Sequence, residues 1–194
     1  MNVLGIDPSY GRTGIATAGD TRSYTPPAAT ADLPPHERAA VRRSWLRGQL
    51  GNAMHGRDLI AVEGMFKSLE YGVIDRAQLL GAIIDLARSI TDAPILVVPP
   101  ASVKLYATGN GNAAKSAMAE ALDAARVTAP WVTHPANDDE ADAWWIAAFA
   151  ADFATGGRAA FVDRTPHQRG AVRALAPPYT RRHPSPWART PTGG

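Results

Sequence analysis

Acidic residues stand at the ends of two predicted strands. An apolar run over residues 2–6 ends at Asp7, and a second over residues 59–62 ends at Glu63. An ionised carboxylate beside a buried strand is costly unless it is solvated, hydrogen-bonded or bound to a positive group. The simplest alternative for Asp7 is a turn cap, because Asp before Pro favours turns.

A third group of acids opens the apolar helix predicted over residues 138–154. It contains Asp138, Asp139, Glu140 and Asp142. Asp139 and Asp142 are three residues apart, so they share a helical face, and apolar residues near that face direct it toward the protein. Acids also favour a helix N-terminus because of the helix dipole, which is the alternative explanation for this cluster.

Carboxylates from two strand ends and a helix start can meet at one edge of an α/β sheet and bind hard cations. Mg²⁺ is usually held by a few carboxylates together with water and substrate phosphate. Two such ions about 4 Å apart can flank a phosphodiester, one activating the attacking water and the other stabilising the leaving oxygen. The chain has no cysteine and no HExxH pattern, so we do not expect a zinc site.

The elements that must position these acids follow from hydrophobic periodicity and turn residues. We expect strands over residues 2–6, 13–18, 21–25, 59–62 and 93–98, helices over residues 36–54, about 69–90 and 138–154, and two helices flanking a glycine loop within residues 101–125. The first three strands have the spacing of an antiparallel meander. This order predicts an α/β fold with a mixed five-stranded sheet flanked by helices.

Length and charge indicate one compact domain followed by a basic tail, which we place at residues 1–155 and 156–194. The chain has 194 residues, of which 45% are hydrophobic. From residue 158 onward there are seven arginines and one acid, whereas residues 1–157 hold 13 basic and 17 acidic groups. The basic tail suggests a polyanionic partner. A solvated tail without a partner is the alternative.

Membrane insertion is not expected. No stretch approaches the roughly 18 apolar residues of a membrane span, and no targeting segment is recognisable. The absence of cysteine fits a reducing compartment, so we expect a cytoplasmic protein.

Four segments resemble, in order, the motifs of RuvC-type Holliday junction resolvases: VLGIDPSYGRTGIA, LIAVEGMF, SVKLYATGNGNAAKSAM and DDEADAWWIA. The resemblance covers about residues 2–152 and implies a ribonuclease H-like fold. It also implies a metal-dependent DNA endonuclease that acts on four-way junctions, with two Mg²⁺ (or Mn²⁺) ions in each active site. Carried over by position, the family's four acids fall on Asp7, Glu63, Asp139 and Asp142, with Asp138 as an alternative to Asp139.

The same resemblance implies that Lys104 and Lys115 are catalytic and bind DNA. They flank a glycine loop, whose backbone N–H groups can meet a phosphate, and lysine adds charge for the transition state. Phe66 resembles an aromatic wedge of the family that stacks on the open junction centre. Alternatively, Phe66 is a residue of the hydrophobic core. Further DNA contacts are expected from arginines on one face of the predicted helix 36–54: Arg38, Arg42, Arg43 and Arg47.

A homodimer is expected, because resolving a four-way junction needs two symmetric cuts and a two-fold protein supplies two equal sites. Its interface would be the helix predicted at about residues 69–90, through Leu79, Leu80, Ile83 and Ile84. The same side chains can equally pack on the sheet.

The sequence is compatible with two other functions. The first motif also resembles the phosphate-loop hairpin of actin-like kinases and ATPases, but those need a second lobe for which a chain of this length has no room. A non-catalytic nucleic-acid-binding module of the same fold is the other. It would keep four acids together without a metal, at a cost of several kcal/mol.

Overall fold

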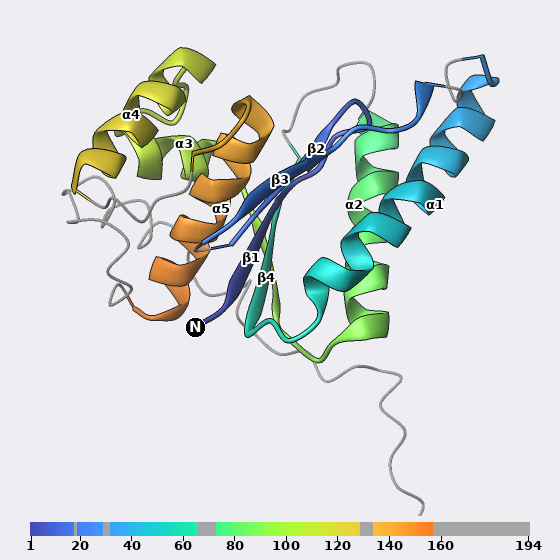
Figure 1. The fold of residues 1–194 in the computed structure, drawn as a ribbon, viewed down its shortest axis with the longest axis horizontal. Coiled ribbons are helices and arrows are strands. Elements are labelled where there is room, and N and C mark those ends of the chain that lie inside the picture. The colour runs from blue at the N-terminus through green and yellow to red at the C-terminus, as the bar shows by residue number, and fades with distance from the viewer. Residues whose placement is uncertain (18, 29–31, 66–72, 129–133, 157–194) are drawn as a thin grey trace, which may run out of the picture.

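The computed structural model describes residues 1–17, 19–28, 32–65, 73–128 and 134–156. The strands in these ranges are β1 (Val3–Asp7), β2 (Thr13–Ala16), β3 (Thr21–Tyr24), β4 (Leu59–Glu63) and β5 (Ile95–Val98). The helices are α1 (Pro35–Met54), α2 (Val73–Ile90), α3 (Pro100–Thr108), α4 (Lys115–Thr128) and α5 (Asp138–Ala154). Figure 1 shows the sheet in the middle, with α1 and α2 on one face and α5, backed by α3 and α4, on the other.

The strands form one mixed sheet in the order β3-β2-β1-β4-β5. β1 is antiparallel to β2, and β2 is antiparallel to β3, which confirms the predicted meander. β4 lies parallel to both β1 and β5. The α/β class with five strands is therefore confirmed, and β1 and β4 end at the same edge of the sheet.

Side chains alternate along the strands between two cores. Leu4 and Ile6 face α1 and α2, where they pack with a cluster that includes Leu50 of α1 and Ile83 of α2. The opposite core contains Val3 and the aromatic side chains Tyr106, Trp144, Trp145 and Phe149. Both tryptophans are therefore core residues.

Helix α5 lies directly on the sheet because two strand glycines leave room for its backbone. A Cβ atom at Gly5 would overlap the carbonyl oxygen of Ala143, and one at Gly14 would overlap that of Asp139. The close approach fixes the first turn of α5 over β2.

Two expectations about the elements need correction. The second strand ends at Ala16 rather than at residue 18, because the Thr17 N–H donates to the Asp20 carbonyl at 2.8 Å and turns the chain. On α2, Leu79 and Ile83 are buried in the sheet core, so these two residues are not available to a dimer interface. Leu80 and Ile84 are half-buried.

No helix in the described part of the chain combines the length and hydrophobicity that crossing a membrane requires.

Candidate active site

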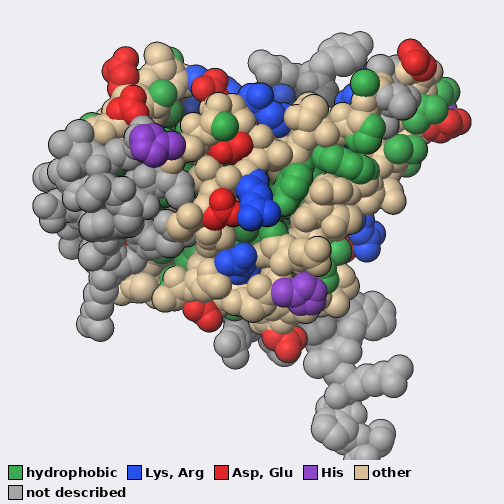
Figure 2. All heavy atoms as spheres, viewed as in Figure 1, with side chains coloured by type: hydrophobic (Ala, Val, Ile, Leu, Met, Phe, Trp, Pro, Cys, Tyr) green, Lys and Arg blue, Asp and Glu red, His purple; other side chains and the backbone are tan. Residues whose placement is uncertain are grey.

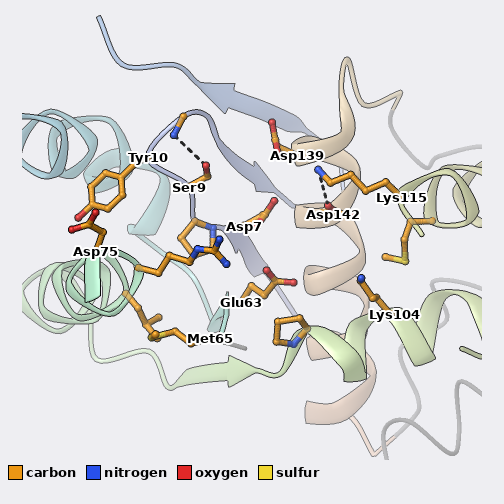
Figure 3. Close-up of a pocket in the computed structure, with 17 residues that line it drawn as sticks. Asp7, Ser9, Tyr10, Glu63, Met65, Asp75, Lys104, Lys115, Asp139 and Asp142 are labelled. Carbon is orange, nitrogen blue, oxygen red and sulfur yellow. Dashed lines mark hydrogen bonds and ion pairs between the residues drawn. The ribbon is translucent and has the colours of Figure 1, made fainter. Parts of the chain in front are cut away.

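A pocket of about 500 Å³ opens at the edge where β1 and β4 end. Figure 3 shows acidic side chains of the two strands facing α5, with basic side chains of α3 and α4 beside them. The pocket is lined by all six residues predicted to be catalytic: Asp7, Glu63, Lys104, Lys115, Asp139 and Asp142. The structure thus brings together residues that are up to 135 positions apart in the chain.

Asp7 and Glu63 are neighbours because their strands are paired in parallel. Ile6 lies opposite Val62, so the next residue of each strand points into the same space. The turn after Asp7 is closed by other residues: the Thr13 hydroxyl donates to the Ser9 carbonyl at 2.8 Å and accepts from the Ser9 N–H at 3.2 Å. Asp7 is therefore not needed to close the turn, and its side chain faces the pocket.

The N-terminal part of α5 supplies the other two acids. Asn137 caps the helix, its side-chain oxygen accepting from the Glu140 N–H at 3.2 Å. Asp139 and Asp142 are half-buried and line the pocket, whereas Asp138 is exposed and is not among the lining residues. The geometry favours Asp139 over Asp138 as the third acid of the site.

Glu140 has a role that the sequence did not reveal. Its buried carboxylate accepts hydrogen bonds from the hydroxyls of Thr21 and Ser23, from the Asn137 amide and from the Ala136 N–H, all between 2.9 and 3.0 Å. Burial alone would raise the pKa of Glu140, but these hydrogen bonds outweigh it and the pKa is lowered. Glu140 therefore ties β3 to the start of α5 and holds Asp139 and Asp142 in place.

The pocket brings together four buried or half-buried acids and only two lysines, and the pKa values of three of these acids are raised. Burial, followed by the charges of Asp142 and Asp139, raises the pKa of Asp7 to about 7. Burial and the charge of Asp7 raise the pKa of Glu63 to about 8, and burial also raises the pKa of Asp142. A cation entering the pocket would relieve this repulsion.

The carboxylates at the start of α5 are paired with basic side chains. The Arg12 Nε donates to an Asp139 oxygen, and the Lys115 Nζ lies 4.0 Å from an Asp142 oxygen. Among the described residues, no three Asp, Glu or His side chains are arranged so that they could hold one metal ion together. The donor set is nonetheless chemically suited to Mg²⁺ or Mn²⁺, because it consists of carboxylates whose charged form is disfavoured by burial and by the neighbouring acids until a cation is bound.

The predicted DNA-contacting arginines of α1 lie outside this pocket. Arg38 donates to the Leu33 carbonyl, with the shorter bond at 2.9 Å. Arg43 donates to the Tyr10 hydroxyl at 3.0 Å and to the Gln78 side chain at 2.8 Å, so it braces the β1–β2 turn against α2. Arg42 is half-buried. Figure 2 shows charged side chains of both signs interspersed over one face of the molecule. Phe66 and the tail lie outside the described residues.

The lining residues that sequence reasoning missed include Tyr10 on the β1–β2 turn, and Asp75 and Arg76 on the first turn of α2. Asp75 and Arg76 follow a segment outside the described residues, and no motif marks them. Asp75 adds an acid on the side of the pocket opposite α5 (Figure 3), and Arg76 adds a base to the lining.

The metal-free protein should lose stability as the pH rises from about 4 to about 8. The ordinary pKa values of Asp7 and Glu63 are 3.8 and 4.5, and the folded values are about 7 and about 8. Stabilisation from such groups is fully present below the unfolded pKa and is lost as the pH passes through the folded pKa. The melting temperature, measured in EDTA across this pH range, checks the direction of the change in stability. Asp7→Asn should show a smaller decrease, and a wild-type melting temperature that rises over this range would contradict the prediction.

Comparisons with known proteins place the chain beside RuvC nucleases. It is 28% identical over 127 residues to the crossover junction endodeoxyribonucleases RuvC of Mycobacterium avium (strain 104) and of Mycolicibacterium paratuberculosis. These matches cover 60% of this chain and 64% of each relative, just under two thirds of the relatives' length. No protein-family model matches the chain.

Solved structures share the fold over most of the chain. The structure of Thermus thermophilus RuvC superposes with a TM-score of 0.57 at 23% identity, covering 81% of this chain and 98% of that one. T. thermophilus RuvC in complex with a Holliday junction substrate gives a TM-score of 0.62 at 20% identity, covering 85% and 100%. The ribonuclease H-like fold implied by the sequence motifs is thereby confirmed.

Proposed function

We propose that this protein is a divalent-metal-dependent DNA endonuclease that resolves four-way junctions by paired phosphodiester hydrolysis. The observation that carries the proposal is the convergence of Asp7, Glu63, Asp139 and Asp142 in one pocket with two lysines. The proposal is supported by the shared fold, since one similar structure is a RuvC bound to a Holliday junction. Fold likeness alone would not carry it, because one fold hosts many functions.

The four carboxylates would hold Mg²⁺ or Mn²⁺, with one or two ions in the pocket. When bound, such ions activate a water molecule and stabilise the departing oxygen of a phosphodiester. Asp7 and Glu63 offer oxygen ligands from strands that are buried in the sheet and therefore rigid. Asp139 and Asp142 face them from α5, whose N-terminus is fixed by Glu140 and Asn137.

Lys104 and Lys115 would meet the phosphate from the α3–α4 side. Both line the pocket, and their positive charges offset part of the rise in the pKa of Glu63 and of Asp142, so both lie within electrostatic reach of these acids. A lysine aimed at a phosphate whose negative charge rises during the reaction stabilises the transition state more than the ground state.

A homodimer would provide the two sites needed for paired cuts. Phe66 would stack on a base near the junction centre, and the arginines of residues 156–194 would add contacts to phosphates. Like other enzymes that act on intracellular DNA, the protein would work in the cytoplasm.

The substrate is tested by comparing cleavage of matched four-way, three-way and linear DNA. The three substrates share one labelled strand and are incubated with Mg²⁺ at a single salt concentration, because affinity for DNA depends steeply on salt. We expect incision of the four-way junction in strands of opposite arms. Equal incision of linear DNA would contradict selectivity for branched DNA, and tight binding without incision would favour a non-catalytic module.

Lys115→Ala and Lys104→Ala should each slow cleavage more than they weaken binding. Loss of one charged contact to the reacting phosphate is expected to lower the single-turnover rate by roughly 10- to 100-fold. Binding of the four-way junction should weaken by less, because affinity is spread over many phosphate contacts. Single-turnover cleavage and a binding titration on the same junction separate the two effects.

Arg88→Ala is the matched control, because Arg88 is an exposed basic residue of α2 that does not line the pocket. It should leave the rate unchanged. If the lysine variants lose affinity as much as rate, the two lysines only position the DNA backbone.

A further inference from the structure

Arg12 is a basic residue beside the pocket. Neither the sequence motifs nor the proposed chemistry gives it a role. It lies on the turn between β1 and β2, and its Nε donates to Asp139. The Arg12 side chain is 43% exposed, whereas that of Asp139 is 15% exposed. The charges of Asp138 and Glu140 also act on Arg12, so the guanidinium is held at the acidic start of α5.

The place of this ion pair matters because Asp139 is one of four acids in a crowded pocket. A carboxylate oxygen that accepts a hydrogen bond from a guanidinium has fewer lone pairs left to bind a metal ion. In the described part of the chain, no three acids are arranged to hold one ion together, and Asp139 is the one acid of the four that Arg12 engages. The exposed guanidinium moves into water when it leaves this pair, and the entering cation replaces it as the positive partner of the largely buried Asp139 carboxylate.

The turn that carries Arg12 is itself well fixed. Thr13 is buried and bonded to Ser9, and the Gly11 N–H donates to the Ser9 hydroxyl at 3.1 Å. Release of Asp139 therefore needs only a rotation of the Arg12 side chain, with no movement of the turn or of α5.

We propose that Arg12 is an internal counter-ion that occupies Asp139 and is displaced when a divalent cation binds. The inference rests on the proposed metal site and adds a positioning residue to it. Arg12 keeps the metal-free pocket from unfavourable repulsion at Asp139 and, for the same reason, weakens cation binding. The affinity of the site for a divalent ion is then a balance between Asp139–cation and Asp139–Arg12 contacts.

Direct binding of Mn²⁺ to the full chain without DNA tests this competition. Free Mn²⁺ is measured by electron paramagnetic resonance in titrations of the wild type, Arg12→Gln and a control, Arg22→Gln. Arg22 forms an exposed ion pair with Asp20, at 2.8 Å, on the β3 side of the sheet. We expect Arg12→Gln to bind Mn²⁺ about 3- to 5-fold more tightly, as loss of one partly exposed ion pair allows, and Arg22→Gln to match the wild type.

A double-mutant cycle separates direct competition from a general charge effect. In an Asp139→Asn background, Arg12 has no carboxylate to occupy, so Arg12→Gln should no longer change the Mn²⁺ affinity. If Arg12→Gln strengthens binding equally with Asp139 and with Asn at that position, Arg12 acts through its charge alone and the proposal is wrong.

The same Mn²⁺ titrations separate the role of Arg12 from the existence of the metal site. If the wild type binds Mn²⁺ and Asp7→Asn weakens that binding, the metal site stands, and an unchanged affinity in Arg12→Gln overturns the counter-ion role alone. If the wild type shows no saturable Mn²⁺ binding, the metal site and the role of Arg12 are both wrong.

Discussion

Asp7→Asn should abolish cleavage of a four-way junction while leaving junction binding almost unchanged. Asp7 ends a buried strand in the middle of the pocket, beside Glu63 and facing α5. Replacing one carboxylate oxygen by an amide removes a charged ligand that the chemical step requires, so we expect a rate loss of about 10³-fold or more. Binding depends mainly on phosphate contacts and gains from removal of a nearby negative charge.

The variant should fold at least as well as the wild type, because burial already disfavours the charged form of Asp7. On one preparation, single-turnover cleavage measures the rate, a binding titration measures the affinity for the junction, and thermal unfolding measures the stability. Asp85→Asn is the control, an exposed acid of α2 outside the pocket, and should cleave normally. Near-normal turnover by Asp7→Asn would show that the acid pocket does not carry the reaction.

Gly14→Ala should destabilise the protein strongly and remove cleavage with it. Gly14 is buried in β2 below the first turn of α5, and an added Cβ would overlap the backbone carbonyl of Asp139. Backbone on both sides cannot give way as a flexible side chain would. We therefore expect a loss of about 3 kcal/mol in the free energy of unfolding, at the upper end of overpacking effects.

Gly48→Ala is the matched control for this substitution. Gly48 is a helical position of α1 with no atom within 4 Å of the added Cβ, so the change should be neutral or slightly stabilising. Denaturant unfolding compares the two variants. A Gly14→Ala protein with wild-type stability would mean that α5 does not pack on β2 as closely as the structure shows.

The sequence was informative where function and fold depend on local pattern. Strand periodicity ending in a carboxylate predicts both the positions of Asp7 and Glu63 and the sheet edge on which they meet. Three-residue spacing predicts that Asp139 and Asp142 share a helical face. These features need only the geometry of one strand or one helix, or the rule that parallel strands end at a common edge.

The features that were missed depend on contacts between distant segments. Glu140 resembles any other acid at a helix start, yet its partners Thr21 and Ser23 are 119 and 117 positions away. Arg12 meets Asp139 across 127 positions. The split of α2, with Leu79 and Ile83 in the core and Leu80 half-buried, depends on the angle at which the helix meets the sheet, which periodicity does not give.

The central claim, that this acid pocket is a divalent-metal nuclease centre, is tested most directly by the metal dependence of junction cleavage. Protein stripped with EDTA and returned to metal-free buffer is mixed with an end-labelled four-way junction, and Mg²⁺ or Mn²⁺ is added in steps. We predict no incision without divalent ions, and a rate that rises with their concentration and saturates. Incision that persists in excess EDTA, or that fails at every concentration of both metals while the junction is bound, would contradict the claim.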